Sequence, residues 1–396
     1  MTMLLSPCVN EDVVVKQRAE MKIEEFKAGR WARCYQYSCF VPEMVNHAWT
    51  WDSISLTMAL ERAVKALAAL DACSQFVPDI DLFIRMHIVH EASASSRIEG
   101  TRTEMEEAVL PEESVVEERR NDWREVNNYV AAMSTAIESL KTLPLSIRLL
   151  RGAHERLLAG VRGEMKYPGQ VRTSQNWIGG NSIATARFIP PAPEYLPDLL
   201  GDLEKFWHNE DIQVPNLIRC AISHYQFETI HPFLDGNGRM GRLLIPFYLI
   251  SKGELSCPSL YISAHLENCR DAYYEALSRA RTHDDLLGWV LFFLEAVTDT
   301  AKTGCAKFKR IFALRDEMSG YSHSLPNPAL ARQLFQYLYS VPRVTINQVA
   351  GELLCGYQAA NRLVKKLVAD RVLVPSSNAK RNAIYDFKRY LAIFKE

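Results

Sequence analysis

The sequence predicts a mainly α-helical protein that ends in a smaller second domain. Two observations support this fold class. Apolar residues recur at helical spacing through most of residues 51–318, and a short β-prone stretch lies near the C-terminal end. In the first region we expect helices over residues 51–70, 82–96, 121–140, 146–159, 196–207, 217–230, 239–250, 266–280 and 286–318.

Residues 1–79 form an N-terminal region in which polar, aromatic-bearing segments precede the first helix. A helical domain over residues 80–318 follows. The first residues include Glu11 and Asp12 and lack a basic segment, so they do not resemble a secretory signal peptide.

We expect one β-hairpin within the helical domain, and we expect it to be the main strand element. Its arms would be residues 171–178 and 182–189, and Gly179, Gly180 and Asn181 would form the turn. A plain surface hairpin is the alternative to a functional one.

The C-terminal domain, residues 329–396, follows a predicted linker over residues 319–328 that is rich in serine and proline. Helix, helix, short turn, helix and hairpin follow in that order, which resembles a winged helix. The expected helices and strands cover residues 329–339, 346–353, 357–370, 372–374 and 383–385.

The third helix and the hairpin of this domain are basic, which would suit contact with DNA phosphates. Winged helices also serve as protein-docking or dimer modules, and the charge would equally suit a solvated face. The basic residues are Arg362, Lys365, Lys366, Arg371, Lys380, Arg381 and Lys388.

Composition excludes several classes of protein. The net charge of the 396 residues is −1, so no overall attraction to nucleic acid or anionic membrane is expected. No apolar run reaches membrane-spanning length. The nine cysteines are scattered and odd in number, which favours free thiols in a reducing compartment, the bacterial cytoplasm being the simplest.

The most informative motif runs from His231 to Arg242. Its glycines lie where the predicted helix 239–250 begins, so their backbone N–H groups and the helix dipole form an anion site. Arg239 and Arg242 are three residues apart and match phosphate geometry. Asp235 would hold Mg²⁺ through one carboxylate, and the imidazole of His231 would accept a proton. The alternative is a glycine turn that only caps the helix.

These residues reproduce the signature H-x-F-x-[DE]-G-N-G-R-x-x-R, and the chain therefore resembles the Fic family. The resemblance implies a helical bundle, with the hairpin as a flap, that transfers AMP from ATP to a hydroxyl side chain of a protein. It implies that His231 is the general base and Asp235 the Mg²⁺ ligand. The ATP-binding residues would be Gly236, Asn237, Gly238, Arg239, Met240, Gly241 and Arg242, with both arginines on the β- and γ-phosphates.

A second match is the segment from Ser95 to Gly100, which resembles the inhibitory motif of this family, [ST]-x-x-x-E-[GN]. The inhibitory helix would cover about residues 82–99. Glu99 would pair with Arg242 and withdraw it from the γ-phosphate. In some relatives the equivalent glutamate activates water to remove AMP, so Glu99 has two candidate roles.

Two further matches concern the surroundings of the nucleotide. The hairpin resembles the flap that aligns a target segment by strand addition. Tyr273 or Tyr274 would line the adenine pocket, with core packing as the alternative for either. The expected target-docking residues of the flap are Trp177, Ile178, Gly179, Gly180 and Asn181.

The leading hypothesis is thus a protein adenylyltransferase that modifies Ser, Thr or Tyr hydroxyls and is inhibited by Glu99. The alternatives are removal of AMP through Glu99, and a DNA-binding regulator with a secondary Fic domain. A protein substrate, self-modification and a homodimer are the partners considered, and a membrane is not among them.

Overall fold

The computed structural model describes residues 20–34, 36–75, 80–376 and 383–395. The protein is mainly helical, as predicted. In chain order its helices are α1 (Ile54–Gln75), α2 (Ile80–Ile98), α3 (Met105–Ala108), α4 (Arg120–Leu140), α5 (Ile147–Leu157), α6 (Leu196–His208), α7 (Asn216–Ile230), α8 (Asn237–Ser251), α9 (Ser263–Asn268), α10 (Arg270–Thr282), α11 (Leu286–His323), α12 (Pro328–Ser340), α13 (Ile346–Glu352), α14 (Tyr357–Ala369) and α15 (Lys388–Lys395).

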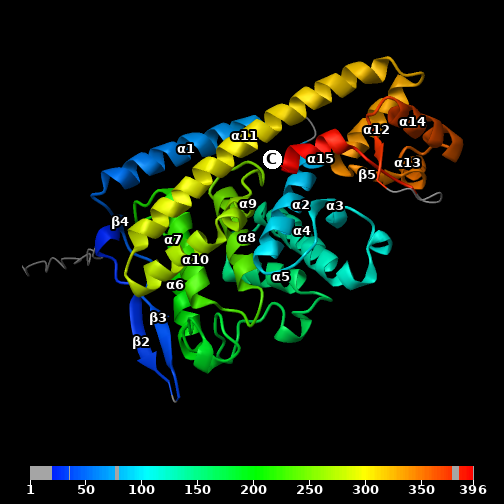
Figure 1. Cartoon of the computed structure of the whole chain (residues 1–396). Helices are drawn as coiled ribbons and strands as arrows, with labels where there is room; N and C mark the ends of the chain where they lie inside the picture. The colour runs from blue at the N-terminus through cyan, green and yellow to red at the C-terminus, as the bar shows by residue number, and fades with distance from the viewer. Residues whose placement is uncertain (1–19, 35, 76–79, 377–382, 396) are drawn as a thin grey trace, which may run out of the picture.

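Helices α7 and α8 form the centre of the molecule, and the long helix α11 runs beside α1 across one side of it (Figure 1). In α7 every residue from Leu217 to Ile230 is buried. A helix that is buried all round has packing partners on every side. The loop that joins α7 to α8 carries the motif, so the motif rests on the most enclosed helices of the fold.

Two of the differences from the predicted helices have a physical reason in the structure. The helix predicted over residues 266–280 is divided into α9 and α10 at Cys269, whose φ of −118° and ψ of 38° are not helical. Helix α11 extends through the first part of the predicted linker, because Tyr321 packs against Phe335 and donates a hydrogen bond to Asp370. Tertiary contacts there override a linker-like composition.

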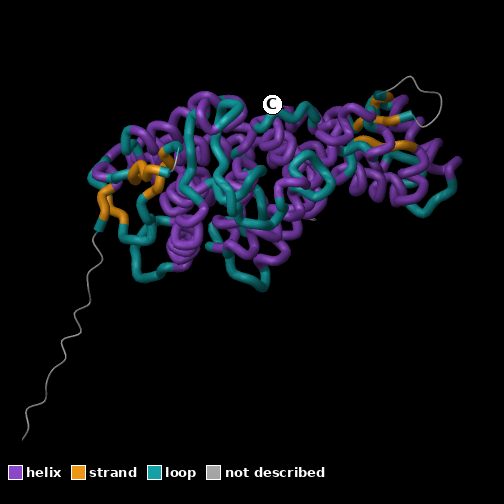
Figure 2. The backbone as a smooth tube through the Cα atoms, turned by 90° about the horizontal axis from the view of Figure 1, so that it is seen from below, coloured by secondary structure: helices purple, strands orange, loops and turns teal. Residues whose placement is uncertain are grey.

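The prediction that the hairpin at residues 171–189 is the main strand element was wrong. Its two arms share only one β-bridge, Ile178 with Phe188, and residues Ile183–Thr185 form a 3₁₀ turn. The strands lie at the two ends of the molecule (Figure 2). They are β1 (Met21–Lys22), β2 (Gly29–Arg33), β3 (Ser38–Pro42), β4 (Trp49–Thr50), β5 (Arg343–Thr345), β6 (Val374–Pro375) and β7 (Ile384–Asp386).

Strands β2 and β3 form an antiparallel hairpin, and β1 pairs with β4 in parallel. In the C-terminal part, α12, α13 and α14 are followed by the antiparallel order β5-β7-β6. Thr345 caps α13 by accepting a hydrogen bond from the Gln348 N–H at 3.3 Å. The predicted order of elements is present, whereas Lys380 and Arg381 lie outside the described residues.

Helix α15, which the sequence did not predict, packs against α2. The ring of Phe394 lies 4.9 Å from that of His87, and Lys395 forms an ion pair of 2.6 Å with Glu106 just after α2. One continuous apolar core joins the N-terminal and C-terminal parts. Among the described helices, none has both the length and the hydropathy needed to cross a bilayer.

Candidate active site

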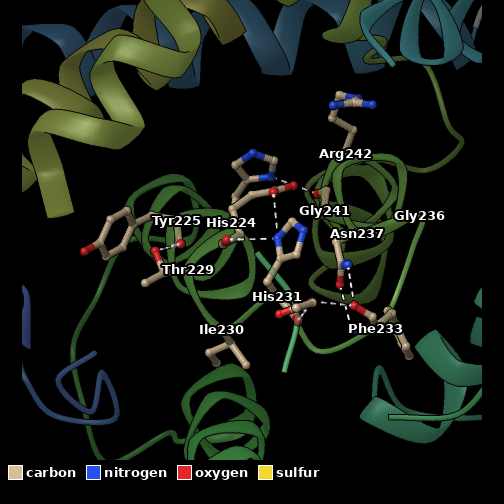
Figure 3. Close-up of polar contacts among 12 residues, drawn as sticks. His224, Tyr225, Thr229, Ile230, His231, Phe233, Gly236, Asn237, Gly241 and Arg242 are labelled. Atoms are coloured by element: carbon tan, nitrogen blue, oxygen red, sulfur yellow. Dashed lines mark hydrogen bonds and ion pairs between the residues drawn. The ribbon is translucent and has the colours of Figure 1, made fainter. Parts of the chain in front are cut away.

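The loop between α7 and α8 is fixed by its own asparagine (Figure 3). Asn237 is 2% exposed. Its Oδ1 accepts a hydrogen bond from the Phe233 N–H and its Nδ2 donates one to the Phe233 carbonyl, both at 2.8 Å. His231 ends α7 in the left-handed region, with φ of 52°, a conformation that a non-glycine residue keeps only when its surroundings enforce it.

The predicted flap, residues 171–189, also forms hydrogen bonds that hold this loop in place. Asn176 donates hydrogen bonds to the carbonyls of His231, at 3.1 Å, and Phe233, at 2.8 Å. Arg172 donates from Nε to the His231 carbonyl at 2.9 Å. Both side chains are buried. Sequence reasoning missed these two roles, although positions 172 and 176 share one face of an extended segment and both are polar.

His154 on α5 holds the loop at Asp235. Its Nδ1 accepts from the Gly169 N–H at 2.8 Å, so the proton is on Nε2, which donates to the Asp235 carbonyl at 2.9 Å. Its ring stacks on Phe233 at 3.8 Å. Burial lowers the pKa of His154 to about 4, which keeps the ring neutral. Nothing in the sequence distinguished this histidine.

His231 is arranged to accept a proton. Its Nδ1 lies 3.3 Å from the backbone carbonyl of Glu228. Since a carbonyl only accepts, Nδ1 carries the hydrogen and Nε2 presents a lone pair. Burial, with a further contribution from the Arg281 cation, lowers the pKa of His231 to about 3. The imidazole is therefore uncharged at neutral pH, with its lone pair on Nε2 free of a proton.

Asp235 leaves one carboxylate oxygen available beside the start of α8. Its Oδ1 accepts from the Gly236 N–H at 2.6 Å, while Oδ2 faces Gly163, where an added Cβ would lie 3.2 Å from it. Within the described part of the chain, no group of three or more His, Cys, Asp or Glu side chains could enclose a metal. The residues fit Mg²⁺ held by one carboxylate, with water and phosphate as the other ligands.

The structure contains the predicted ion pair between Glu99 and Arg242. Arg242 is 1% exposed, and its Nη2 donates to Glu99 Oε1 at 2.7 Å and to the Ser95 carbonyl at 2.9 Å. Its Nε donates to Ser95 Oγ at 2.8 Å. Burial alone would raise the pKa of Glu99, but the Arg242 cation outweighs it and the pKa is lowered. Glu99 is therefore a carboxylate that binds this arginine through one of its oxygens.

Two motif glycines make room for carboxyl groups. An added Cβ would lie 2.3 Å from Glu99 Oε1 at Gly238, and 2.1 Å from Glu228 Oε1 at Gly241. The Glu99 carboxylate thus lies against the first turn of α8, where the anion site was predicted. Sequence reasoning missed Glu228, which is buried and whose pKa is raised by that burial to about 7.

Other predicted residues have distinct surroundings. Tyr273 is 1% exposed and its hydroxyl contacts His224 Nε2 at 2.9 Å, so it packs in the core. Tyr274 is 40% exposed and is the one available to a ligand. The side chain of Met240 is fully buried, which leaves only its backbone to face a nucleotide.

The tip of the flap is open to solvent. Trp177 is 41% exposed. Gly179 and Gly180 have φ values of 69° and 74°, as the predicted turn requires. Asn181 is exposed beside them. Gly100 is also exposed and has a φ of 98°, where the chain turns away after Glu99.

Comparison with known proteins agrees with this geometry. Residues 57–138 match the Fic/DOC family N-terminal region, and residues 144–249 match the Fic/DOC family. The chain is 30% identical over 146 residues to a protein adenylyltransferase, fic-1, of Caenorhabditis briggsae, covering 37% of this chain and 27% of that protein. It is 38% identical over 108 residues to a probable protein adenylyltransferase of Aquifex aeolicus, covering 26% and 33%.

The structure is also similar to solved ones. A Fic family protein from Desulfovibrio desulfuricans superposes with a TM-score of 0.54 at 20% identity, over 84% of this chain and 96% of that one, which shows a shared fold. The chain spans about a third or less of the length of the curated relatives above. The two Fic/DOC family regions therefore lie at residues 57–138 and 144–249, and the second contains the complete motif at the junction of α7 and α8.

Proposed function

We propose that this chain is a protein adenylyltransferase that transfers AMP from ATP to a Ser, Thr or Tyr hydroxyl of a protein, and that Glu99 inhibits it. The observation that carries the proposal is the contact of Glu99 with Arg242 at the first turn of α8, beside an unprotonated His231. Relatives named protein adenylyltransferases support the same activity.

In the proposed reaction the target hydroxyl oxygen attacks the α-phosphorus of ATP. The bond from that phosphorus to the bridging oxygen breaks, and pyrophosphate leaves. Nε2 of His231 accepts the hydroxyl proton, while the N–H groups at the start of α8 stabilise the phosphates. Asp235 would hold Mg²⁺, which neutralises phosphate charge when bound. The loop braces described above keep His231 in place throughout.

Inhibition follows from competition for one arginine. While Glu99 and Ser95 bind Arg242, the hydrogens of its Nε and Nη2 are unavailable to a γ-phosphate. A carboxylate against Gly238 also places negative charge where a phosphate would bind. Loss of Glu99 should release one Nη2 hydrogen of Arg242, remove the negative charge beside Gly238 and leave the catalytic loop unchanged, since no loop brace involves Glu99.

The test is transfer of label from α-phosphate-labelled ATP with Mg²⁺, using a cell lysate as the source of targets. We expect little label with the wild type, strong label with Glu99→Gly, and none with Glu99→Gly/His231→Ala. Label of equal strength in the double variant would refute the assignment of His231. Absence of label in all three, with ATP binding confirmed, would indicate another donor or AMP removal as the activity.

A second candidate function, DNA binding by the C-terminal part, rests on Arg362 and Lys365, which are exposed on α14. Leu354, just before that helix, and Tyr357, its first residue, are 94% and 55% exposed, which also suits a protein partner. A gel shift with random duplex DNA at low and moderate salt separates the two.

A further inference from the structure

The two motif arginines are held by different helices. Arg242 contacts α2, whereas Arg239 faces α4, where its Nη1 lies 3.4 Å from Glu125 Oε2. Arg239 and Glu125 are each only 5% exposed. A buried guanidinium without a nearby carboxylate is strongly unfavourable. Glu125 therefore allows Arg239 to stay charged beside the anion site of α8.

Glu125 is itself fixed in place. Arg162 donates from Nε to Glu125 Oε1 at 2.8 Å and from Nη2 to Asp122 Oδ1 at 3.1 Å. Asp122 lies one turn earlier on α4, and its Oδ2 accepts from the Arg102 N–H at 2.9 Å. Arg162 balances the charge of Glu125, so the carboxylate can hold Arg239 without placing a net negative charge beside a phosphate.

Arg239 retains unused hydrogen-bonding capacity. Its Nε is buried and has no hydrogen-bond partner among the described residues, and its contact with Glu125 is long at 3.4 Å. A guanidinium carries five N–H donors. A buried arginine with donors to spare, at the start of a helix, is the group that a phosphate requires.

We propose that Glu125 is a positioning residue that holds Arg239 ready for the phosphates of the nucleotide. The inference rests on the proposed function, because it takes ATP as the ligand of α8. A long side chain that is ordered before binding loses less rotamer entropy when the ligand arrives, so preorganisation raises affinity. Glu125 differs in this from Glu99, which occupies its arginine in place of the ligand.

The experiment compares Glu125→Gln with Glu138→Gln in the full chain, both in a Glu99→Gly background so that Glu99 no longer binds Arg242. Glu138 lies on the same helix, with its side chain 72% exposed and paired with Lys141. Binding of Mg-ATP and of AMP is measured by calorimetry. We expect Glu125→Gln to weaken ATP binding about tenfold and to leave AMP binding unchanged, because AMP lacks the β- and γ-phosphates. Glu138→Gln should change neither.

A double-mutant cycle with Arg239→Gln completes the test, since Glu125→Gln should have no further effect once Arg239 is replaced. Three results would overturn the inference: an unchanged or tighter ATP affinity, an equal loss for ATP and AMP, or a loss that persists without Arg239. A Glu99→Gly parent that binds ATP but transfers no AMP contradicts the proposed function alone. A parent that binds no ATP overturns both.

Discussion

The catalytic loop, residues 231–238, and the inhibitory segment, residues 95–100, meet at the start of α8 but are held in different ways. The loop is fixed by neutral amide groups and by Arg172 on backbone carbonyls, all buried. The segment holds the catalytic helix through one arginine, and the Glu99 side chain is 36% exposed. The loop is thus built to keep one geometry, and none of the hydrogen bonds that fix it involves Glu99.

The largest expected effect comes from removing the hydrogen bonds that fix the catalytic loop. Asn237→Ala removes two buried hydrogen bonds and leaves the Phe233 N–H without a partner, while the Phe233 carbonyl keeps only the bond from Asn176, so we expect unfolding stability to fall by about 2–3 kcal/mol. Displacement of His231 should lower transfer by about 100-fold in a Glu99→Gly background. Label transfer and thermal melting measure the two. Asn181→Ala at the exposed flap tip is the control for stability, and equal melting temperatures of the two variants would contradict the bracing role.

The next largest effect comes from weakening the contact between Glu99 of the inhibitory segment and Arg242. Glu99→Gly should raise transfer about tenfold or more, since it removes a charge-assisted hydrogen bond to a buried arginine. Glu99→Gln keeps an acceptor but loses the charge, so an intermediate rise is expected. Initial rates at saturating ATP rank the variants. If Gln and Gly are equally active, charge alone holds the segment.

Ser95→Ala tests a smaller part of the same contact. It removes the bond from Arg242 Nε to the hydroxyl, while the Ser95 carbonyl still accepts from Nη2. A rise in transfer of about threefold is expected. Ser93→Ala on the same buried helix is the matched control, since the Ser93 hydroxyl has no partner among the described residues. A similar rise in both variants would assign the effect to α2 packing.

The last prediction concerns the dependence of stability on pH. Burial lowers the pKa of His90, His154, His224 and His231 to about 3–4, whereas the unfolded value is about 6.5. The unfolded chain therefore binds more protons below pH 6.5, and stability should decrease as the pH falls from 6.5 to 5. Glu228, with its pKa raised to about 7, opposes this, because its contribution is lost as pH rises. Melting temperatures at pH 7.5, 6 and 5 provide the test, with His231→Ala expected to reduce the slope.

The sequence predicted the parts of the site that neighbouring residues define. The glycine turn, His231 and both arginines lie within twelve residues, so helical spacing was sufficient to place them at the start of α8. Pairing of Glu99 with Arg242 came from a second motif. The mainly helical class followed from periodicity in the same way.

The parts that depend on contacts between distant segments were missed. Asn176 donates to the catalytic loop, and Arg172 donates both to that loop and to the Pro191 carbonyl just beyond the opposite arm, while the predicted hairpin has only one bridge. Glu125 and His154 act from separate helices, and single polar residues on a helix face carry no distinguishing pattern. Tyr273 is the opposite case. It was a candidate for the adenine pocket, with core packing as the alternative, and it packs in the core.

The position of α15 against α2 has a consequence for the order in which the protein is synthesised. The motif at residues 231–242 leaves the ribosome well before residues 388–395 exist, by on the order of ten seconds at ordinary translation rates. During that interval α2 lacks the packing of Phe394, and α3 lacks the ion pair of Glu106 with Lys395. The nascent chain therefore carries its catalytic motif before the support of its inhibitory helix is complete.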